Sequence, residues 1–374
     1  MKYIRNRTDM NKIVIPSDVL TLNDIFNRNG HKLYVVGGAI RDFIKGDKPK
    51  DYDLCTDAVP DRIMEILKDK YKFQLQGESF GVVVVYTDET PEGMEIATFR
   101  EDITKGRNPE VRFGNVTIEQ DVKRRDITFN GLFYDIESKE IIDLVGGKED
   151  LLNKVVRMIG NPMERIAEDP LRIFRVFRFA TRYGSIIDKV TKNAIHKHND
   201  ISSVSMERIW DTENGEFMKS FKQAKNFQQY LDLLSEFNLW DQILPDMHVN
   251  TKISNSDNIE LVLAQMFLSE SVENINNLPI SSKILGKVTF LISLLNFSSD
   301  DLLGFYKTRK RTDTDNKTIS TWLNLNNISG LARKFINFKP SINSSKVMSD
   351  FNLTPSKELG DKIKELEINK FLNS

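Results

Sequence analysis

The sequence contains little of several residue types on which particular functions depend. Its 374 residues include one cysteine, Cys55, and four histidines. A single cysteine forms no internal disulfide and no thiolate zinc site, which indicates a reducing environment, and we expect a cytoplasmic protein. No apolar run approaches the roughly 18 residues that a membrane span needs. The N-terminal stretch is polar and has no apolar signal core, so the sequence predicts neither secretion nor membrane insertion.

Net charge is almost absent as well. The chain has 53 Lys and Arg against 54 Asp and Glu, a formal net charge of −1. This balance excludes a generally cationic protein but is compatible with nucleic-acid binding through a local patch. The run KTRKR is such a patch, and we predict RNA contacts from Lys307, Arg309 and Arg311. A solvated surface run is an equally favoured interpretation.

The order of apolar patterns divides the chain into two kinds of structure. Residues 32–38 read as a buried strand that ends in glycines, and 51–58 as a second strand. Residues 131–144 read as a hairpin, and after Gly147 the pattern becomes helical and stays so. The sequence therefore predicts an α+β protein, with a mixed α/β head followed by an all-helical remainder.

Two aspartates separated by one residue, Asp51 and Asp53, stand at the start of the second strand. On a strand, residues i and i+2 point to the same side, so both carboxylates should share one face. Two like charges that close are unfavourable unless a cation lies between them. Oxygen ligands that are few in number suit Mg²⁺, which completes its shell with waters and phosphates. For the tripeptide alone, a polar turn is the favoured alternative.

The residues upstream make a phosphate site the better interpretation. Gly37 and Gly38 follow the first strand, where they let the backbone approach a ligand and leave N–H groups for phosphate oxygens. Arg41 lies one turn into the helix that follows, where it can add a charge-assisted contact. Glu95, on a later predicted strand, could help to hold a metal or accept the proton of an attacking hydroxyl, unless it is an ordinary strand residue.

Two further segments offer arginines beside acids. In RRDITFN, Arg125 can reach a triphosphate or its ribose, Asp126 could orient it, and Asn130 could anchor the turn. The segment 167–184 predicts a helix that begins near Pro170. Its acid and arginines recur every three residues along one side: Asp169, Arg172, Arg175 and Arg178.

The first two of these, Asp169 and Arg172, could read a base. An acceptor paired with a donor matches cytosine or adenine, because each base carries an amine beside an acceptor nitrogen. An Asp/Arg ladder that merely stabilises the helix is equally favoured by this stretch alone.

Over roughly residues 30–220 the chain resembles a known family. The segments GGAIRD, DYD, MEIATFR, RRDITFNGLFYD, DLVGGKEDL, EDPLRIFRVFRFATRYG and SMERIWDTENGEF follow the order of the class II tRNA nucleotidyltransferases and bacterial poly(A) polymerases. The resemblance implies a polymerase-β-like nucleotidyltransferase head followed by a helical neck, body and tail. The implied ranges are 1–29 for an N-terminal extension, 30–147 for the head, 148–222 for the neck, 223–310 for the body and 311–374 for the tail.

The resemblance also assigns roles to residues. It implies metal binding by Asp51 and Asp53 and a third catalytic carboxylate at Glu95. It implies contacts to the nucleotide's phosphates and sugar from Gly38, Arg41 and Arg125. It implies base selection by Asp169 and Arg172, with Arg175 and Arg178 nearby, on a helix that Glu207 and Arg208 brace. It also implies a mobile loop at 101–120.

The implied activity is untemplated addition of C, C and A to tRNA 3′ ends, from CTP and ATP, with two Mg²⁺ ions and release of pyrophosphate. A poly(A) polymerase and a partial CC- or A-adding enzyme share every head motif, so the head leaves these alternatives open, and the compact length favours CCA addition. A non-catalytic RNA-binding protein and a small-molecule nucleotidyltransferase are disfavoured by the intact acids and by the long helical part.

Overall fold

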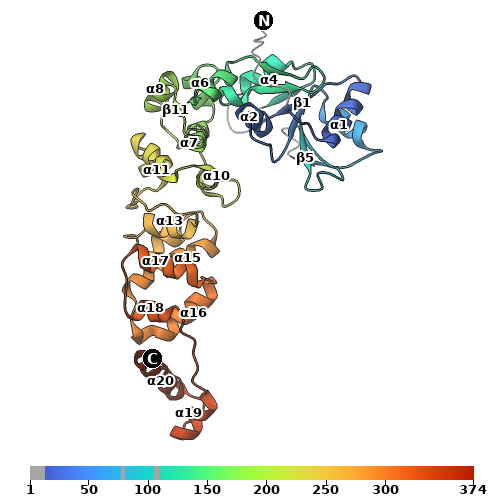
Figure 1. The fold of residues 1–374 in the computed structure, drawn as a ribbon. Coiled ribbons are helices and arrows are strands. Elements are labelled where there is room, and N and C mark those ends of the chain that lie inside the picture. Colours follow the sequence, from blue (N-terminus) through green and yellow to red (C-terminus); the bar gives the residue numbers. More distant parts are fainter. Residues whose placement is uncertain (1–12, 77–80, 105–109) are drawn as a thin grey trace. The chain divides into compact units, whose positions relative to one another are not determined.

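The computed structural model describes residues 13–76, 81–104 and 110–374, and the chain divides into two compact units, Met1–Val204 and Ser205–Ser374 (Figure 1). The described part of the first unit combines a mixed sheet with helices. The second unit, all of whose residues are described, contains helices and no strand. The predicted fold class, an α/β head followed by a helical remainder, is confirmed.

The first unit begins with helix α1, which lies in the range predicted as an extension. Its helices and strands are α1 (Ser17–Arg28), β1 (Leu33–Val36), α2 (Gly38–Lys45), β2 (Asp53–Thr56), α3 (Pro60–Leu67), β3 (Lys72–Gln76), β4 (Val82–Tyr86), β5 (Met94–Thr98), β6 (Arg100–Asp102), β7 (Val111–Phe113), α4 (Ile118–Arg124), the 3-10 turn η3 (Thr128–Asn130), β8 (Leu132–Asp135), β9 (Glu140–Asp143), α5 (Gly147–Leu152), β10 (Val155–Val156), α6 (Pro162–Glu168), α7 (Leu171–Tyr183), β11 (Ile186–Ile187) and α8 (Lys189–Lys197).

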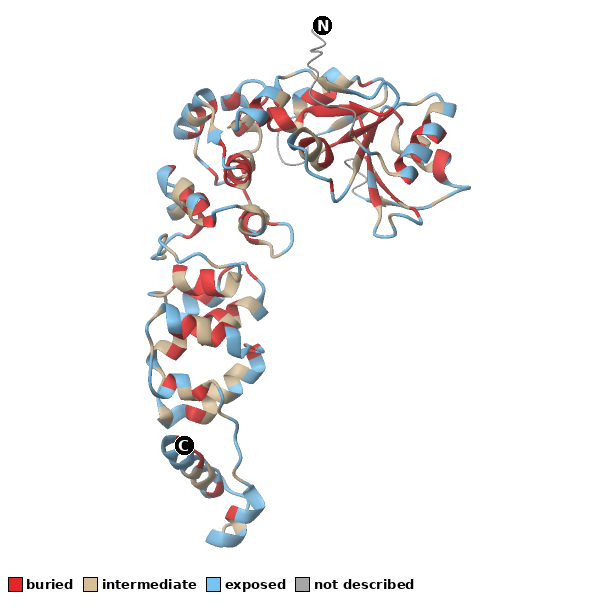
Figure 2. Cartoon of the chain, in the orientation of Figure 1, coloured by how far each residue is buried: buried red, intermediate tan, exposed pale blue. Residues whose placement is uncertain are grey.

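The described residues of the head form a seven-stranded sheet in the order β3-β4-β5-β2-β1-β8-β9. Strands β2 and β5 run parallel, and the other neighbours are antiparallel. Figure 2 shows buried strands in the middle of this sheet, whereas the edge strands β3 and β9 are exposed or half-buried. Tyr34, Phe99 and Phe133 pack within the head core, with ring centroids 5.7 to 6.1 Å apart. The predicted hairpin at 131–144 is present as β8 and β9.

The turn from β1 into α2 depends on Gly37, whose φ is +70°. A side chain there would be strained by the backbone conformation, and its Cβ would lie 2.6 Å from Oδ2 of Asp53. The short helix α2 then ends at Gly46, which adopts the left-handed conformation that suits a helix C-terminus. The diglycine turn is therefore pressed directly against the start of β2.

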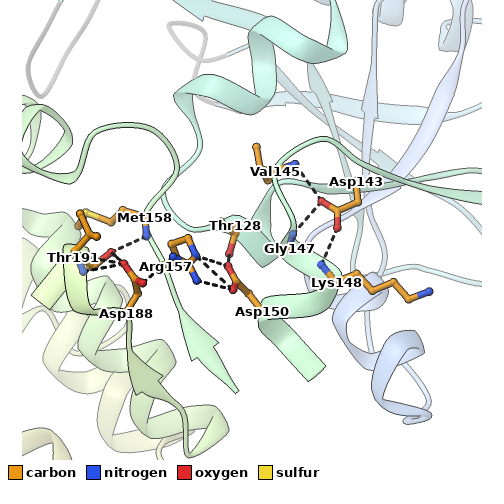
Figure 3. Close-up of polar contacts among 11 residues, drawn as sticks. Thr128, Asp143, Val145, Gly147, Lys148, Asp150, Arg157, Met158, Asp188 and Thr191 are labelled. Atoms are coloured by element: carbon orange, nitrogen blue, oxygen red, sulfur yellow. Dashed lines mark hydrogen bonds and ion pairs between the residues drawn. The ribbon is translucent and has the colours of Figure 1, made fainter. Parts of the chain in front are cut away.

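The segment DLVGGKED joins the sheet to the first helix after it. Asp143 accepts hydrogen bonds from the N–H groups of Gly147 (2.9 Å) and Lys148 (2.9 Å), which begin α5 (Figure 3). A Cβ on Gly147 would lie 2.2 Å from the carbonyl oxygen of Thr128. Glycine is thus required at 147 because α5 packs against the backbone of η3, next to the candidate site.

An ion-pair network continues from this junction. Arg157 donates to Asp150 (3.0 Å) and to Asp188 (2.7 Å), and the hydroxyl of Thr128 donates to Asp150 at 2.7 Å (Figure 3). Asp188 also caps α8 by accepting from backbone N–H groups. The network fixes η3, α5 and α8 to one another.

One prediction about this region is wrong. The chain after Gly147 is not uniformly helical, because β10 and β11 pair in parallel with Val155 opposite Ile186. These strands have two residues each, which is too short for an alternating pattern to be recognised in the sequence.

The second unit is a series of helices around an aromatic core. Trp210 and Phe217 are fully buried with ring centroids 4.3 Å apart, and Phe335 packs 5.1 Å from Phe297 near the C-terminal end. Its elements are α9 (Met206–Trp210), α10 (Glu216–Gln223), α11 (Phe227–Glu236), α12 (Trp240–Ile243), α13 (Ile259–Met266), α14 (Val272–Asn276), α15 (Ser282–Ser293), η4 (Leu294–Asn296), η5 (Ser299–Asp301), α16 (Leu302–Thr312), α17 (Asn316–Leu325), α18 (Leu331–Phe335), α19 (Ser344–Phe351) and α20 (Lys357–Asn373).

The division after Val204 falls inside the range predicted as neck, 148–222. The predicted domain ranges stay predictions. Among the helices that the structure describes, none has the length and apolar character needed to cross a bilayer.

Candidate active site

The two aspartates of the DYD segment meet at the diglycine turn. The Cβ position of Gly37 is 2.6 Å from Oδ2 of Asp53, and that of Gly38 is 3.6 Å from Oδ1 of Asp51. Strand β2 begins at Asp53, so Asp51 precedes the strand rather than sharing it as predicted. Both carboxylates nevertheless reach the same turn, because the chain just before β2 passes alongside it.

Glu95 lies on the strand next to Asp53. In the parallel pair β2–β5, Leu54 is opposite Ile96, which places Asp53 level with Glu95. Leu54 and Ile96 are buried, whereas Glu95 is exposed, so the two acids lie on the other face of the sheet from these apolar partners. The structure thus brings together the three acids that the sequence predicts.

The electrostatic setting of Asp53 shows how crowded these acids are. Burial, followed by the charges of Asp51 and Glu95, raises the pKa of Asp53 to about 6, against the lowering effect of Arg41 and Arg125. A carboxylate whose charge is disfavoured by acidic neighbours is stabilised when a cation binds beside it.

The donor set fits a metal that takes few protein ligands. Among the described residues, no group of three or more His, Cys, Asp or Glu side chains is arranged to hold an ion. Mg²⁺ commonly uses one or two carboxylates and takes its other ligands from water and substrate phosphates. Asp51 and Asp53 can supply that number.

Arg41 is built into the first unit rather than exposed. Its side chain is buried, Nε donates to the hydroxyl of Tyr183 at 3.0 Å, and Nη1 donates to Oδ1 of Asn130 at 2.6 Å. Its third nitrogen, Nη2, is 3.8 Å from the Cβ position of Gly38. Arg41 therefore carries a positive charge to the diglycine turn and links that turn to η3 and to the end of α7.

Arg125 has a different partner from the one predicted. Its Nε donates to Asp121 at 2.9 Å, Nη1 donates to the carbonyl of Asn130 at 3.0 Å, and the guanidinium stacks 4.4 Å from the ring centroid of Phe133. Asp121 is fully buried. The prediction that Asp126 orients Arg125 is wrong, because Asp121 on α4 does so from four residues earlier, one helical turn away.

Asp126 instead binds the helix α7. Its Oδ2 accepts from Nε of Arg175 at 2.7 Å, and its Oδ1 accepts from the amide of Asn130 at 2.8 Å and from the N–H of Ile127. Burial alone would raise the pKa of Asp126, but the Arg175 guanidinium and these hydrogen bonds outweigh it and hold the pKa well below the ordinary value. Asn130 thus connects Arg41, Arg125 and Asp126, a larger role than the predicted turn anchor.

The helix pair α6–α7 carries the residues predicted to read the base. Asp169 precedes α7 and accepts from the N–H of Leu171 at 3.2 Å. Arg172 uses Nη1 to donate to the carbonyl of Arg165 at 2.6 Å and to Glu168 at 3.0 Å. Arg172 is therefore held in place by α6 beside Asp169.

The three arginines that the sequence places along one side of α7 have different partners in the structure. Arg175 binds Asp126, whereas Arg178 is buried, with its guanidinium 4.3 Å from the ring centroid of Phe179. A row of residues three apart rotates around a helix, so successive members meet different surroundings. The structure places Asp169 and Arg172 together, and Arg175 and Arg178 farther along α7.

Sequence reasoning missed the residues that hold these side chains. Asp121 and Glu168 carried a signal, since each lies four residues before the arginine that it binds. Tyr183 had none, because it is 142 residues away from Arg41.

The other predicted residues lie elsewhere. Within 101–120, β6 and β7 form a hairpin, and 105–109 lie outside the described residues. Glu207 is in α9 and Lys307 in α16, both in the second unit, as are the remaining members of their motifs, Arg208, Arg309 and Arg311.

Comparisons with known proteins show the family to which the chain belongs. Residues 33–157 match the model of the poly A polymerase head domain, and 186–250 match a probable RNA- and SrmB-binding site of polymerase A. Poly(A) polymerase I of Salmonella typhi is 30% identical over 285 residues, 73% of this chain and 59% of its own length. Human mitochondrial CCA tRNA nucleotidyltransferase 1 is 38% identical over 200 residues, 51% and 44% of the two chains.

Solved structures share the fold. The Thermotoga maritima CCA-adding enzyme complexed with tRNA superposes with a TM-score of 0.68 and 19% identity, over 98% of this chain and 94% of that one. The Bacillus stearothermophilus CCA-adding enzyme in complex with CTP gives 0.63 and 20% identity, over 95% and 92%.

Fold and site together define a nucleotidyltransferase. Within that class, the chain belongs to the family of class II tRNA nucleotidyltransferases and bacterial poly(A) polymerases, as the sequence resemblance implied. The chain spans 44 to 59% of the length of the curated relatives named above.

Proposed function

We propose that this protein adds C, C and A to tRNA 3′ ends from CTP and ATP, without a nucleic-acid template. The observation that carries the proposal is the meeting of Asp51 and Asp53 at the diglycine turn, with Glu95 level with Asp53 on the neighbouring strand. Acids at this spacing beside backbone N–H groups suit a triphosphate and its metal. Membership of the family supports the same chemistry.

Asp51 and Asp53 would hold Mg²⁺, and we expect two ions. The bound metal would neutralise charge on the phosphates and favour departure of pyrophosphate. The raised pKa of Asp53 supports this assignment, because an acid that resists ionisation beside other acids gains most from a cation.

The reaction itself is a nucleotidyl transfer. The tRNA 3′-hydroxyl oxygen bonds to the α-phosphorus, the bond from that phosphorus to the bridging oxygen breaks, and pyrophosphate leaves. Glu95 would accept the hydroxyl proton or help to hold a metal, and its position level with Asp53 supports either role. Gly37 and Gly38 admit the triphosphate close to the backbone, and Arg125 donates to its phosphates or ribose.

Base selection belongs to Asp169 and Arg172. An acceptor beside a donor fits the amine and ring nitrogen that cytosine and adenine share. Arg172 is held through Nη1 by Glu168 and by the carbonyl of Arg165, which fixes the orientation of its planar guanidinium. Because Asp169 lies between α6 and α7 and Arg172 lies on α7, selection is separate from the acids at the diglycine turn and on the sheet.

Poly(A) synthesis is the second candidate. It is favoured by the match to poly(A) polymerase I of Salmonella typhi over 285 residues, the longer of the two sequence alignments described above. CCA addition is favoured by a fold shared over 98% of the chain with a CCA-adding enzyme complexed with tRNA.

One assay separates the candidates. The protein is incubated with Mg²⁺ and a tRNA that ends at the discriminator base, with CTP and ATP supplied separately and together. Three added residues followed by a stop support CCA addition. A long adenylate ladder supports poly(A) synthesis, addition of only C residues or only A supports a partial enzyme, and no incorporation contradicts the proposal.

A further inference from the structure

The second unit contains a hollow of about 500 Å³ that the proposed chemistry does not use. This volume is within the range of roughly 300 to 1,000 Å³ that is typical of small-ligand sites. Helix α16 contributes to it together with the chain that follows α16 and the chain that follows α18, two helices labelled in Figure 1. The lining residues that carry the argument are Tyr306, Arg309, Lys310, Asp315, Phe338 and Lys339.

Arg309 lines this hollow, and its guanidinium is already hydrogen-bonded to other groups of the protein. Its Nη1 donates to the carbonyl of Ile336 at 2.7 Å, its Nε donates to the carbonyl of Thr314 at 3.4 Å, and Nη2 contacts Asn316. Burial lowers the pKa of Arg309 from its ordinary value. The residue therefore fixes the chain after α18 against the end of α16, and thereby shapes the hollow.

Two aromatic rings and two lysines line the hollow. Tyr306 and Phe338 are half-buried, and their rings meet edge to face at 5.8 Å. Lys310 and Lys339 are exposed. Side chains that combine ring faces with free ammonium groups suit a base and its neighbouring phosphates.

The lining contains two acids, Asp313 and Asp315, against three cations, Arg309, Lys310 and Lys339, so its formal net charge is +1. Asp315 accepts from the N–H of Thr318 at 2.9 Å and from its hydroxyl at 2.7 Å, so its carboxylate serves as the cap of α17. Asp313 ends α16 in the left-handed conformation. Exposed Lys307 and Arg311 on α16 add further positive charge beside the hollow.

We propose that this hollow binds one nucleotide of the RNA substrate, with the base against the rings of Tyr306 and Phe338 and with flanking phosphates on Lys310 and Lys339. The proposal rests on the proposed function for the identity of the RNA. It differs from the patch predicted from sequence, because Arg309 is structural and Lys339 comes from a separate segment of the chain.

The test compares two double variants of the full chain. Lys310→Ala/Lys339→Ala removes the cations of the hollow, and Lys357→Ala/Lys364→Ala removes two exposed lysines of α20 as a matched control. Fluorescence anisotropy with a tRNA that lacks its CCA end is measured over a range of salt concentrations. Each phosphate contact contributes roughly 0.7 to 0.9 to the magnitude of the slope of log K against log salt concentration. We therefore expect that magnitude to fall by about 1.4 to 1.8 in the first variant only.

A second variant pair tests the stacking. Tyr306→Ala should weaken RNA binding by roughly five- to 100-fold, whereas Tyr306→Phe, which keeps the ring, should bind as the wild type does. Thermal melting identifies any loss of folding in Tyr306→Ala, and the double lysine variant tests the proposal independently of that result.

Binding and turnover are measured separately. A wild-type protein that binds RNA through this hollow but adds no nucleotide would contradict the proposed function and leave this inference standing. Equal RNA affinity and equal salt slopes in the two double variants would overturn the inference. It would also be overturned if the hollow variant lost affinity for an acidic peptide and kept its affinity for RNA.

Discussion

The pKa of Asp53 is determined by burial, by two neighbouring acids and by two arginines. Its carboxylate lies against Gly37, level with Glu95, and its pKa is raised to about 6. The charge of Asp53 is disfavoured in these surroundings, and a cation bound beside the acids would offset that cost. The proposed metal site therefore predicts what removal of the carboxylate does.

We predict that Asp53→Asn lowers the rate of nucleotide addition by more than about 100-fold. Mutation of a residue that only supports a metal ligand already lowers metal affinity or activity by roughly 10- to 100-fold, and Asp53 is proposed as a ligand itself. The fold should survive, because the amide has the same shape and removes a buried charge beside two acids. Steady-state rates and thermal melting without metal check both parts. Asp61→Asn, at an exposed position of α3, is the control. Wild-type turnover in Asp53→Asn would contradict the assignment.

The second prediction concerns Arg172. Arg172→Ala should reduce discrimination of CTP and ATP against UTP and GTP before it abolishes transfer, because the acids lie on the sheet and Arg172 on α7. The ratio of kcat/KM values among the four nucleotides is the measurement. Arg172→Lys, which keeps the charge without the planar fork, is the matched comparison. Lost turnover with unchanged selectivity would remove Arg172 from base reading.

Cys55 gives a third, simpler prediction. Its thiol is fully buried on β2, and burial raises its pKa to about 12. Both effects suppress the reactive thiolate, so a thiol reagent should label the native protein far more slowly than the unfolded protein at pH 8. Rapid native labelling would show that β2 is not packed as described.

At this scale the sequence predicted which residues lie together better than it predicted their contacts. Paired acids, a diglycine and arginines are recognisable because phosphate chemistry requires those residue types at those spacings. The partner of Arg125 was wrong because acids lie both one and four residues from it, and only the helix geometry of α4 favours Asp121. Arg41 and Tyr183 are too far apart along the chain for any local pattern to connect them.

At the scale of elements, α6 and α7 are joined to the sheet of the first unit through the RRD segment, residues 124–126. Asp126 binds Arg175, while Arg165 from α6 contacts the carbonyl groups of Arg124 and Arg125. The helix that carries Arg172 is thus fixed to the segment that carries Arg125. These contacts would connect the proposed phosphate-binding residue to the proposed base-reading residue.

We predict that Asp126→Asn lowers the free energy of unfolding by about 3 kcal/mol at pH 7, because it breaks the ion pair with Arg175. This value is the lower end of the range for a broken buried pair, and we choose it because the Arg175 side chain is 37% exposed. The folded pKa of Asp126 lies below its unfolded value of about 3.9, so its stabilisation is present above that pH and is lost on acidification. Denaturant unfolding should show the difference from the wild type shrinking between about pH 5 and pH 2. A difference that is constant over this range would contradict the ion pair.

The sequence also predicted elements unequally. The buried strands and the capped helices were recognisable, because apolar runs bounded by glycine or proline are strong signals. Strands β10 and β11 were missed, since two residues cannot show a period. Helix α1 was left in an extension, although Val19, Leu22 and Phe26 are buried in the first unit.

At the scale of the whole molecule, the chain combines a sheet unit that carries the acids with a helical unit that carries the aromatic and basic hollow. The resemblance in sequence ended near residue 220, so the second unit was predicted only as helical. The hollow depends on residues from two separate segments, 306–316 and 336–339, and no spacing in the sequence indicates that they meet.

The central claim is that Asp51 and Asp53 together hold divalent metal against a nucleoside triphosphate. Its most direct test is the binding of Mn²⁺, followed by electron paramagnetic resonance of the free ion, with a non-hydrolysable CTP analogue present. We predict saturable binding by the wild type, loss of that binding in Asp51→Asn/Asp53→Asn, and no loss in Asp61→Asn. Mn²⁺ binding of equal affinity and stoichiometry in the wild type and the double variant would contradict the claim.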